Sequence, residues 1–211
     1  KFAAVTANDS LIIFVRNLDK GKVKTRLAES VGDDQALIIY HKLLQYTRSV
    51  TKQLNCDKFV YYSDRIDHND LWDNMKYEKH LQQGQSLGER MQSALADQFA
   101  LGKQRVVIIG SDCIELETYM IKEAFAVLEN NDVVIGPASD GGYYLLGMRK
   151  FLPTLFENKE WSGDNLLMDT LLDLKKMSAK YYLLKTLNDI DTVEDLDSIG
   201  RRSEQKPEDW F

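Results

Sequence analysis

Short apolar runs alternate along the chain with longer segments that carry apolar residues at helical spacing. Five runs have the length and composition of buried strands: 11–16, 58–62, 105–109, 132–135 and 143–148. Weaker runs at 77–81 and 181–184 indicate two more strands. We predict helices from Asp33 or Asp34, from Leu87 with Ser86 as its cap, over 117–129, over 164–177, and from Thr192. This alternation predicts an α/β fold with a mostly parallel central sheet covered on both faces.

The length and composition of the chain fit one globular domain. With 44% hydrophobic and 28% charged residues among 211, the chain can bury a core. We expect a single domain over 1–211, with its core at about 11–200 and a C-terminal tail at 201–211, where the pattern ends. Trp210 and Phe211 in that tail suit docking onto the body or onto a second chain, which leaves an oligomer open.

Composition also argues against several classes of protein. No apolar run approaches the roughly 18 residues that cross a bilayer, so we expect no membrane span. Two cysteines, Cys56 and Cys113, are too few for a disulfide framework, which favours a cytoplasmic location. The net charge of −6 disfavours a general nucleic-acid-binding protein.

A basic loop follows the first predicted strand. Residues 16–26 hold five basic side chains and one acid, Asp19, which gives a local charge of +4 in an acidic protein. Ligands of such sheets bind beyond the carboxyl ends of the strands, and Gly21 lets the backbone approach an anion there. We therefore expect Arg16, Lys22, Lys24 and Arg26 to bind phosphate, against the alternative of a solvated charged loop. Neither a Walker A loop nor GxGxxG occurs, which disfavours P-loop and dinucleotide-binding enzymes.

Acidic residues follow three other predicted strands. Asp112 comes directly after the strongest strand, where a carboxylate is suited to hold Mg²⁺ or Mn²⁺ beside a phosphate, although aspartate also caps helices and fills turns. Asp140 precedes Gly141 and Gly142 in a turn that either lies close to a ligand or simply joins two strands. Asp189 and Asp191 precede Thr192, whose spacing to Asp195 resembles a capping box.

Cys113 lies next to Asp112 but has no histidine near it in sequence. Without a neighbouring base, a thiolate nucleophile is not indicated, and we interpret Cys113 as a packing residue.

Several segments together resemble a known family. In order they are LIIFVRNLDKGKVKTRLA at 11–28, QGQSLGERM at 83–91, VVIIGSD at 106–112, GPASDGGYYLL at 136–146, EWS at 160–162 and DIDTVEDL at 189–196. They resemble the DUF2064 family, the "rSAM/selenodomain-associated transferase 1" proteins, which are described as glycosyltransferases. That family is similar to the wider nucleotide-diphospho-sugar transferase superfamily with its GT-A fold. The resemblance covers about residues 11–197.

The resemblance implies a role for each matching segment. It puts Lys22, Lys24, Thr25 and Arg26 in the phosphate-binding loop. It also implies nucleotide-base contacts for Gln83, Gly84, Leu87 and Gly88, metal ligation by Asp112 and Asp191, and an acceptor side at Asp140, Gly141, Gly142 and Tyr143. The chain departs from the family where members often have proline, at Ile114 and Val193, which makes both turns less rigid.

We therefore expect a GT-A-like three-layer α/β/α transferase that uses a nucleotide or nucleotide sugar with Mg²⁺ or Mn²⁺ and an unidentified acceptor. Lys24 and Asp140 are the candidate catalytic residues. The lysine-rich loop favours nucleotidyl transfer from a triphosphate and the resemblance favours glycosyl transfer, so both stay open. The alternative to an enzyme is a non-catalytic nucleotide-binding or partner-binding protein that retains the pocket.

Overall fold

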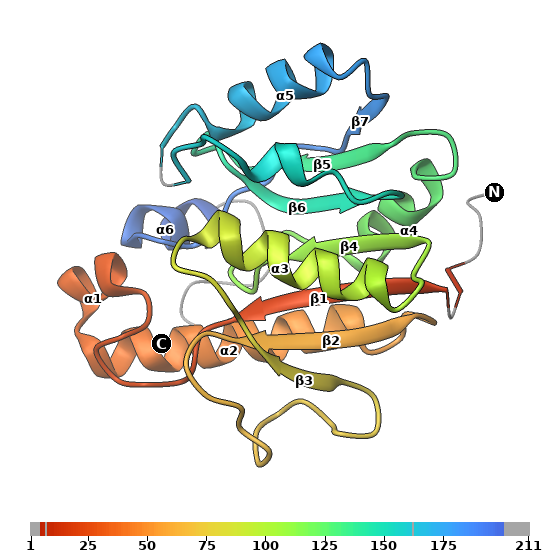
Figure 1. The fold of residues 1–211 in the computed structure, drawn as a ribbon. Coiled ribbons are helices and arrows are strands. Elements are labelled where there is room, and N and C mark those ends of the chain that lie inside the picture. The colour runs from red at the N-terminus through yellow and green to blue at the C-terminus, as the bar shows by residue number, and fades with distance from the viewer. Residues whose placement is uncertain (1–4, 7, 162, 201–211) are drawn as a thin grey trace.

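The computed structural model describes residues 5, 6, 8–161 and 163–200, with no side-chain description for 199 and 200. In this part of the chain, seven strands form one sheet in the order β3-β2-β1-β4-β6-β5-β7 (Figure 1). The strands are β1 (Asp9–Val15), β2 (Asp57–Tyr62), β3 (Glu78–Leu81), β4 (Arg105–Ile109), β5 (Val133–Pro137), β6 (Tyr143–Met148) and β7 (Tyr181–Leu183). β6 runs antiparallel to both of its neighbours, β4 and β5, and every other pair in the sheet is parallel.

Helices cover both faces of the sheet and make three layers (Figure 1). α2 (Asp33–Thr51) and α4 (Thr118–Val127) pack on one face, and α3 (Leu87–Ala100) and α5 (Leu166–Lys176) pack on the other. Successive residues of a strand point to opposite faces, so Ile13 joins the first core cluster and Ile12 the second. The predicted three-layer α/β fold with a mostly parallel sheet is therefore confirmed.

Two short helical elements were not predicted. α1 (Thr25–Val31) begins inside the basic loop, and its N-cap residue, Lys24, makes no capping hydrogen bond through its side chain, so the usual start signal is missing. The 3-10 turn η1 (Pro153–Phe156) has only four residues. α6 (Val193–Gly200) begins one residue after Thr192, as the capping pattern predicts. The tail 201–211 lies outside the described residues.

No helix in the described ranges has both the length and the apolar content that crossing a membrane requires.

A buried ion pair fixes the start of two central strands. Asp9 and Arg105 are register partners at the first positions of β1 and β4. Arg105 donates from Nε to Asp9 Oδ1 at 2.6 Å and from Nη2 to Oδ2 at 2.8 Å. The Asp9 side chain is 1% exposed, and its carboxylate also accepts from the backbone N–H of Thr6 at 2.6 Å.

We expect Arg105→Met to reduce the free energy of unfolding by about 3–5 kcal/mol, because it leaves a buried carboxylate without its cation. Urea unfolding measures the loss. The matched control is Lys176→Met, since Lys176 pairs with Asp173 but its side chain is 75% exposed. That control should cost less than about 1 kcal/mol. Equal losses in the two variants would contradict the stabilising role of the Asp9–Arg105 pair.

Candidate functional site

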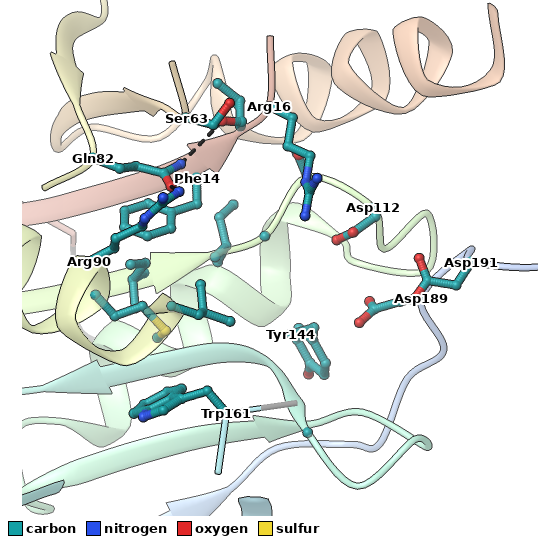
Figure 2. A pocket seen from close by; sticks show the side chains of 18 of the residues that line it. Phe14, Arg16, Ser63, Gln82, Arg90, Asp112, Tyr144, Trp161, Asp189 and Asp191 are labelled. Atoms are coloured by element: carbon teal, nitrogen blue, oxygen red, sulfur yellow. Dashed lines mark hydrogen bonds between the residues drawn. The ribbon is translucent and has the colours of Figure 1, made fainter. Parts of the chain in front are cut away.

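A cleft of about 1020 Å³ opens where β1 and β4 end and β6 begins. Its walls come from the loop after β1, the loop after β4, the turn between β5 and β6, the start of α3 and the segment before α6. Figure 2 shows Asp112, Asp189 and Asp191 at one end of this cleft, and Phe14, Gln82 and Arg90 at the other. The cleft therefore has an acidic end and an end with a cation and an aromatic ring.

Lys24 lies at the acidic end and holds two of its carboxylates. Its Nζ donates to Asp112 Oδ2 at 2.9 Å and to Asp191 Oδ1 at 2.7 Å. The Lys24 side chain is only 5% exposed, although both aspartates remain partly open to solvent. Its backbone has φ 46°, in the left-handed region, immediately before α1. The two predicted metal ligands are thus brought together, with an ammonium group between them.

The electrostatics of this group favour charged forms for the paired residues. Burial lowers the pKa of Lys24, but the adjacent Asp112 and Asp191 outweigh burial and raise it above its usual value. Burial likewise raises the pKa of Asp112, but the Lys24 ammonium outweighs it and holds this pKa below the usual range. Lys24 and Asp112 therefore form an ion pair at neutral pH.

Asp189 is the third carboxyl group at this end, and unlike Asp112 and Asp191 it has one buried oxygen, Oδ1, without a hydrogen-bond partner among the described residues. Burial and the neighbouring Asp112 raise the pKa of Asp189 well above its usual value. A buried carboxyl oxygen without a donor is costly, so this atom is available to a ligand or cation.

The donor set suits a hard cation, but the described side chains do not form a ready-made metal site. No group of three or more His, Cys, Asp or Glu side chains in the described ranges is close enough to hold a metal ion. Mg²⁺ is usually bound by only one or two carboxylates together with waters and substrate phosphates. Asp112 and Asp191, with the unpartnered oxygen of Asp189 nearby, fit that requirement once phosphate is present.

Three segments that are distant in sequence are tied together around Lys24. The backbone N–H of Ile190 donates to the carbonyl of Asp112 at 3.0 Å, which joins the segment before α6 to the loop after β4. The hydroxyl of Tyr40, on α2, accepts from the backbone N–H of Arg16 at 2.8 Å and hydrogen-bonds Ser111 at 3.2 Å. The position of Asp112 is therefore fixed from both sides.

All the predicted phosphate-binding residues of the basic loop line the cleft. Arg16, Lys22, Thr25 and Arg26 all line the cleft and are exposed at its rim. Arg26 Nη1 lies 3.9 Å from Asp191 Oδ2. Lys20 is not among the lining residues and instead pairs with Asp34 on the surface at 2.7 Å.

The predicted base-binding and acceptor residues are only partly in the cleft. Leu87, Asp140, Gly142 and Tyr143 line it. Gln83, Gly84, Gly88 and Gly141 do not, and two of these glycines serve packing. A Cβ on Gly88 would lie 2.1 Å from the Trp161 ring, and one on Gly141 would lie 1.9 Å from the carbonyl of Asp164.

The sequence analysis assigned no role to Gln82, Arg90 or Trp161, all of which line the cleft, although Arg90 and Trp161 lie in segments that carry the family resemblance. Arg90 is three residues after Leu87 in α3, and helical spacing puts the two side chains on the same face, so this spacing could have predicted that Arg90 lines the cleft. Trp161 stacks on Phe156 with ring centroids 5.7 Å apart.

Cys113 packs into the core, and burial raises the pKa of its thiol. Both observations favour the interpretation of Cys113 as a packing residue.

The sheet order, the reversed β6 and the cleft at the carboxyl ends define a protein with the nucleotide-diphospho-sugar transferase fold. The chain is 33% identical to a Desulfovibrio desulfuricans protein assigned to the nucleotide-diphospho-sugar transferases, with a TM-score of 0.86 over 94% of this chain and 89% of that one. Residues 46–163 match DUF2064, described as uncharacterized proteins conserved in bacteria. The chain belongs to the DUF2064 family.

More distant solved structures share the fold. The inositol-1-phosphate CTP transferase from T. maritima is 12% identical, with a TM-score of 0.57 and 96% of both chains covered. A Mycobacterium tuberculosis protein in complex with manganese, Rv0371c, is also 12% identical, with a TM-score of 0.55 over 95% of this chain and all of that one. No curated protein matches the sequence.

We expect the stability contribution of Lys24 to depend on pH. The pKa of Asp112 is lowered by folding, so the pair stabilises the protein above the unfolded carboxyl value, about 3.9, and loses this effect as pH falls through the folded value. The raised pKa of Lys24 keeps the contribution intact up to about pH 10. The difference in unfolding free energy between the parent and Lys24→Met should therefore shrink as the pH falls below about 4.

Urea unfolding across this pH range measures that difference. Lys20→Met is the matched control, because Lys20 and Asp34 are both exposed. Its difference from the parent should stay near zero at every pH. A Lys24→Met difference that does not change with pH would rule out the ion pair as the source of stability.

Proposed function

We propose that this protein is a transferase that binds a nucleotide or nucleotide sugar in the cleft and acts with a divalent cation. The observation that carries the proposal is Lys24 in its setting: a buried ammonium joins two carboxylates beneath a rim of exposed cations. Arg16, Lys22 and Arg26 form that rim, and their charges suit a chain of phosphates. The 33% identical relative, named as a nucleotide-diphospho-sugar transferase, supports the same class.

Asp112 and Asp191 are the residues proposed to hold the cation, with Asp189 beside them. When bound, such a cation would neutralise charge on phosphate oxygens. The side chains of this protein do the remaining work. Lys24, released from a carboxylate when phosphate arrives, can donate to phosphate oxygens, and the exposed rim orients the nucleotide. Stabilising charge that develops on the leaving group is the main electrostatic contribution expected of such a site.

The acceptor side is proposed for the turn between β5 and β6. Asp140 is exposed at the cleft, and its Oδ1 accepts from the backbone N–H of Gly142 at 2.9 Å, which orients the carboxylate. A carboxylate held in this way can take a proton from an acceptor hydroxyl. Tyr143 forms the adjacent wall with Trp161, their rings in edge contact with centroids 6.4 Å apart.

Two transfers fit the cleft. In nucleotidyl transfer, an acceptor phosphate attacks the α-phosphorus of a nucleoside triphosphate and pyrophosphate leaves. In glycosyl transfer, an acceptor hydroxyl attacks a sugar carbon and a nucleoside diphosphate leaves. The density of cations in 16–26 favours the triphosphate, and the name of the 33% identical relative is compatible with a sugar nucleotide.

Turnover with pooled acceptors separates these reactions. Release of pyrophosphate from nucleoside triphosphates identifies nucleotidyl transfer, and release of nucleoside diphosphate from sugar nucleotides identifies glycosyl transfer. Nucleotide binding without either release would support the non-catalytic alternative instead.

We expect Arg26→Ala to weaken nucleotide binding by about 10- to 150-fold, because a charge-assisted hydrogen bond contributes roughly 1.5–3 kcal/mol. Lys20→Ala removes the same charge from the same loop, but Lys20 lies outside the cleft, so its affinity should match the parent's. Isothermal titration calorimetry with a nucleoside triphosphate measures both. If the two variants bind equally well, the phosphate assignment of the loop is wrong.

We expect Asp112→Asn to abolish the effect of Mg²⁺ or Mn²⁺ on nucleotide affinity, because the amide keeps the shape of the side chain and removes its charge. Titrations with and without the cation measure the effect. Asp140→Asn, which alters the acceptor side only, should keep the metal dependence of the parent. Metal-dependent binding that survives in Asp112→Asn would refute this ligand assignment.

A further inference from the structure

Arg90 lies at the end of the cleft opposite the three carboxylates (Figure 2). It is in the first turns of α3, and two hydrogen bonds fix its guanidinium. Its Nε donates to the carbonyl of Gly84 at 3.0 Å and its Nη1 donates to Gln82 Oε1 at 3.4 Å. A planar guanidinium held at two points presents its remaining N–H groups in a defined direction.

No carboxylate forms an ion pair with Arg90 in the part of the chain that the structure describes. Asp64, which also lines the cleft, accepts from the hydroxyl of Ser63 at 2.7 Å. Within the described ranges, two of the five N–H groups of Arg90 are used by the protein, which leaves three to donate to a ligand in the cleft. A partly buried cation without a counter-charge in a ligand cleft indicates a recognition role.

Gln82 is held in place by three hydrogen bonds within the protein. Its Nε2 donates to the carbonyls of Val15 at 3.2 Å and Tyr61 at 2.9 Å, and its Oε1 accepts from Arg90. Both N–H groups of the amide are therefore used by β1 and β2, and its carbonyl oxygen positions the guanidinium by accepting from Arg90. Arg90 therefore supplies the donors that this pair offers to a ligand at this end of the cleft.

The surroundings of Arg90 suit a flat ring. Phe14, Leu87 and Met91 line the cleft, and Figure 2 shows the Phe14 ring beside Arg90 and Gln82. An aromatic side chain and aliphatic neighbours provide a surface on which a nucleobase can stack. Because the phosphates are proposed to lie beside 16–26, a base at this end would extend away from the carboxylates.

We propose that Arg90 determines base specificity by donating two hydrogen bonds to a nucleobase edge with two adjacent acceptors. This inference rests on the proposed function and names the class of nucleotide. Guanine has such an edge at O6 and N7, and cytosine has one at O2 and N3. Adenine places its amino group beside N1 and N7, and uracil places an N–H between its two carbonyls. The site thus favours guanine or cytosine nucleotides over adenine and uracil nucleotides.

The test is a calorimetric titration of the parent and its variants with GTP, CTP, UTP and ATP in magnesium chloride. The parent should bind GTP or CTP more tightly than ATP by about tenfold to a hundredfold, and the better of the two identifies the base. Arg90→Met should lose this preference by weakening the preferred nucleotide while ATP affinity stays the same. Arg90→Lys keeps the charge but not the fork, so it should lose the preference as well.

Arg26→Ala is the matched control, because a phosphate contact should weaken all four nucleotides by the same factor. Circular dichroism and thermal unfolding check that each variant is folded, and Arg90→Lys remains informative if Arg90→Met does not fold. A parent that binds all four nucleotides equally, or an Arg90→Lys variant that keeps the parent's preference, overturns the inference while leaving nucleotide binding intact. A parent that binds neither these four nucleotides nor the corresponding sugar nucleotides refutes the proposed function itself.

Discussion

The arrangement of the acidic end of the cleft depends on the ion pairs that the ammonium group of Lys24 makes with two carboxylates. This ammonium group is nearly excluded from solvent and satisfies Asp112 and Asp191, which come from two separate segments. Without a cation between them, these carboxylates and Asp189 would repel one another at short range. The ends of β1 and β4 and the segment before α6 therefore take their relative positions around one positive charge. A substrate or metal that enters must compete with Lys24 or replace it.

The sheet positions the segments that surround Lys24, and the loops carry most of the charged side chains of the cleft. Central strands such as β4, with Val106 to Ile109 buried, provide a rigid edge. The cation rim and the carboxylates all follow strand ends or precede α6, where side chains can change without disturbing the core. This division explains how structures that are only 12% identical keep the fold, and why the fold alone does not name the reaction.

The sequence was informative wherever a signal is local. The run that became β4 was predicted with its observed ends, because a short apolar segment buried on both faces leaves little ambiguity. Ser86 was correctly predicted as the cap of α3 and accepts from the N–H of Glu89. Lys24 meets its partners 88 and 167 positions away, and Gln82 binds carbonyls of other strands, so no spacing rule reveals either arrangement. The basic loop was predicted as a phosphate site, but the ion pairs of Lys24 with Asp112 and Asp191 required the fold.

Because β6 runs in the reverse direction, the two sides of the cleft are built from different kinds of connection. Because β6 begins at the cleft, its wall is a hairpin turn between two strands that are already paired, whereas the opposite wall grows from crossovers through whole helices. Lengthening such a turn costs only about 0.6 kcal/mol per doubling of its length. The turn between Pro137 and Tyr143 can therefore vary in length at small cost, within the limit set by Gly141, which packs against the carbonyl of Asp164.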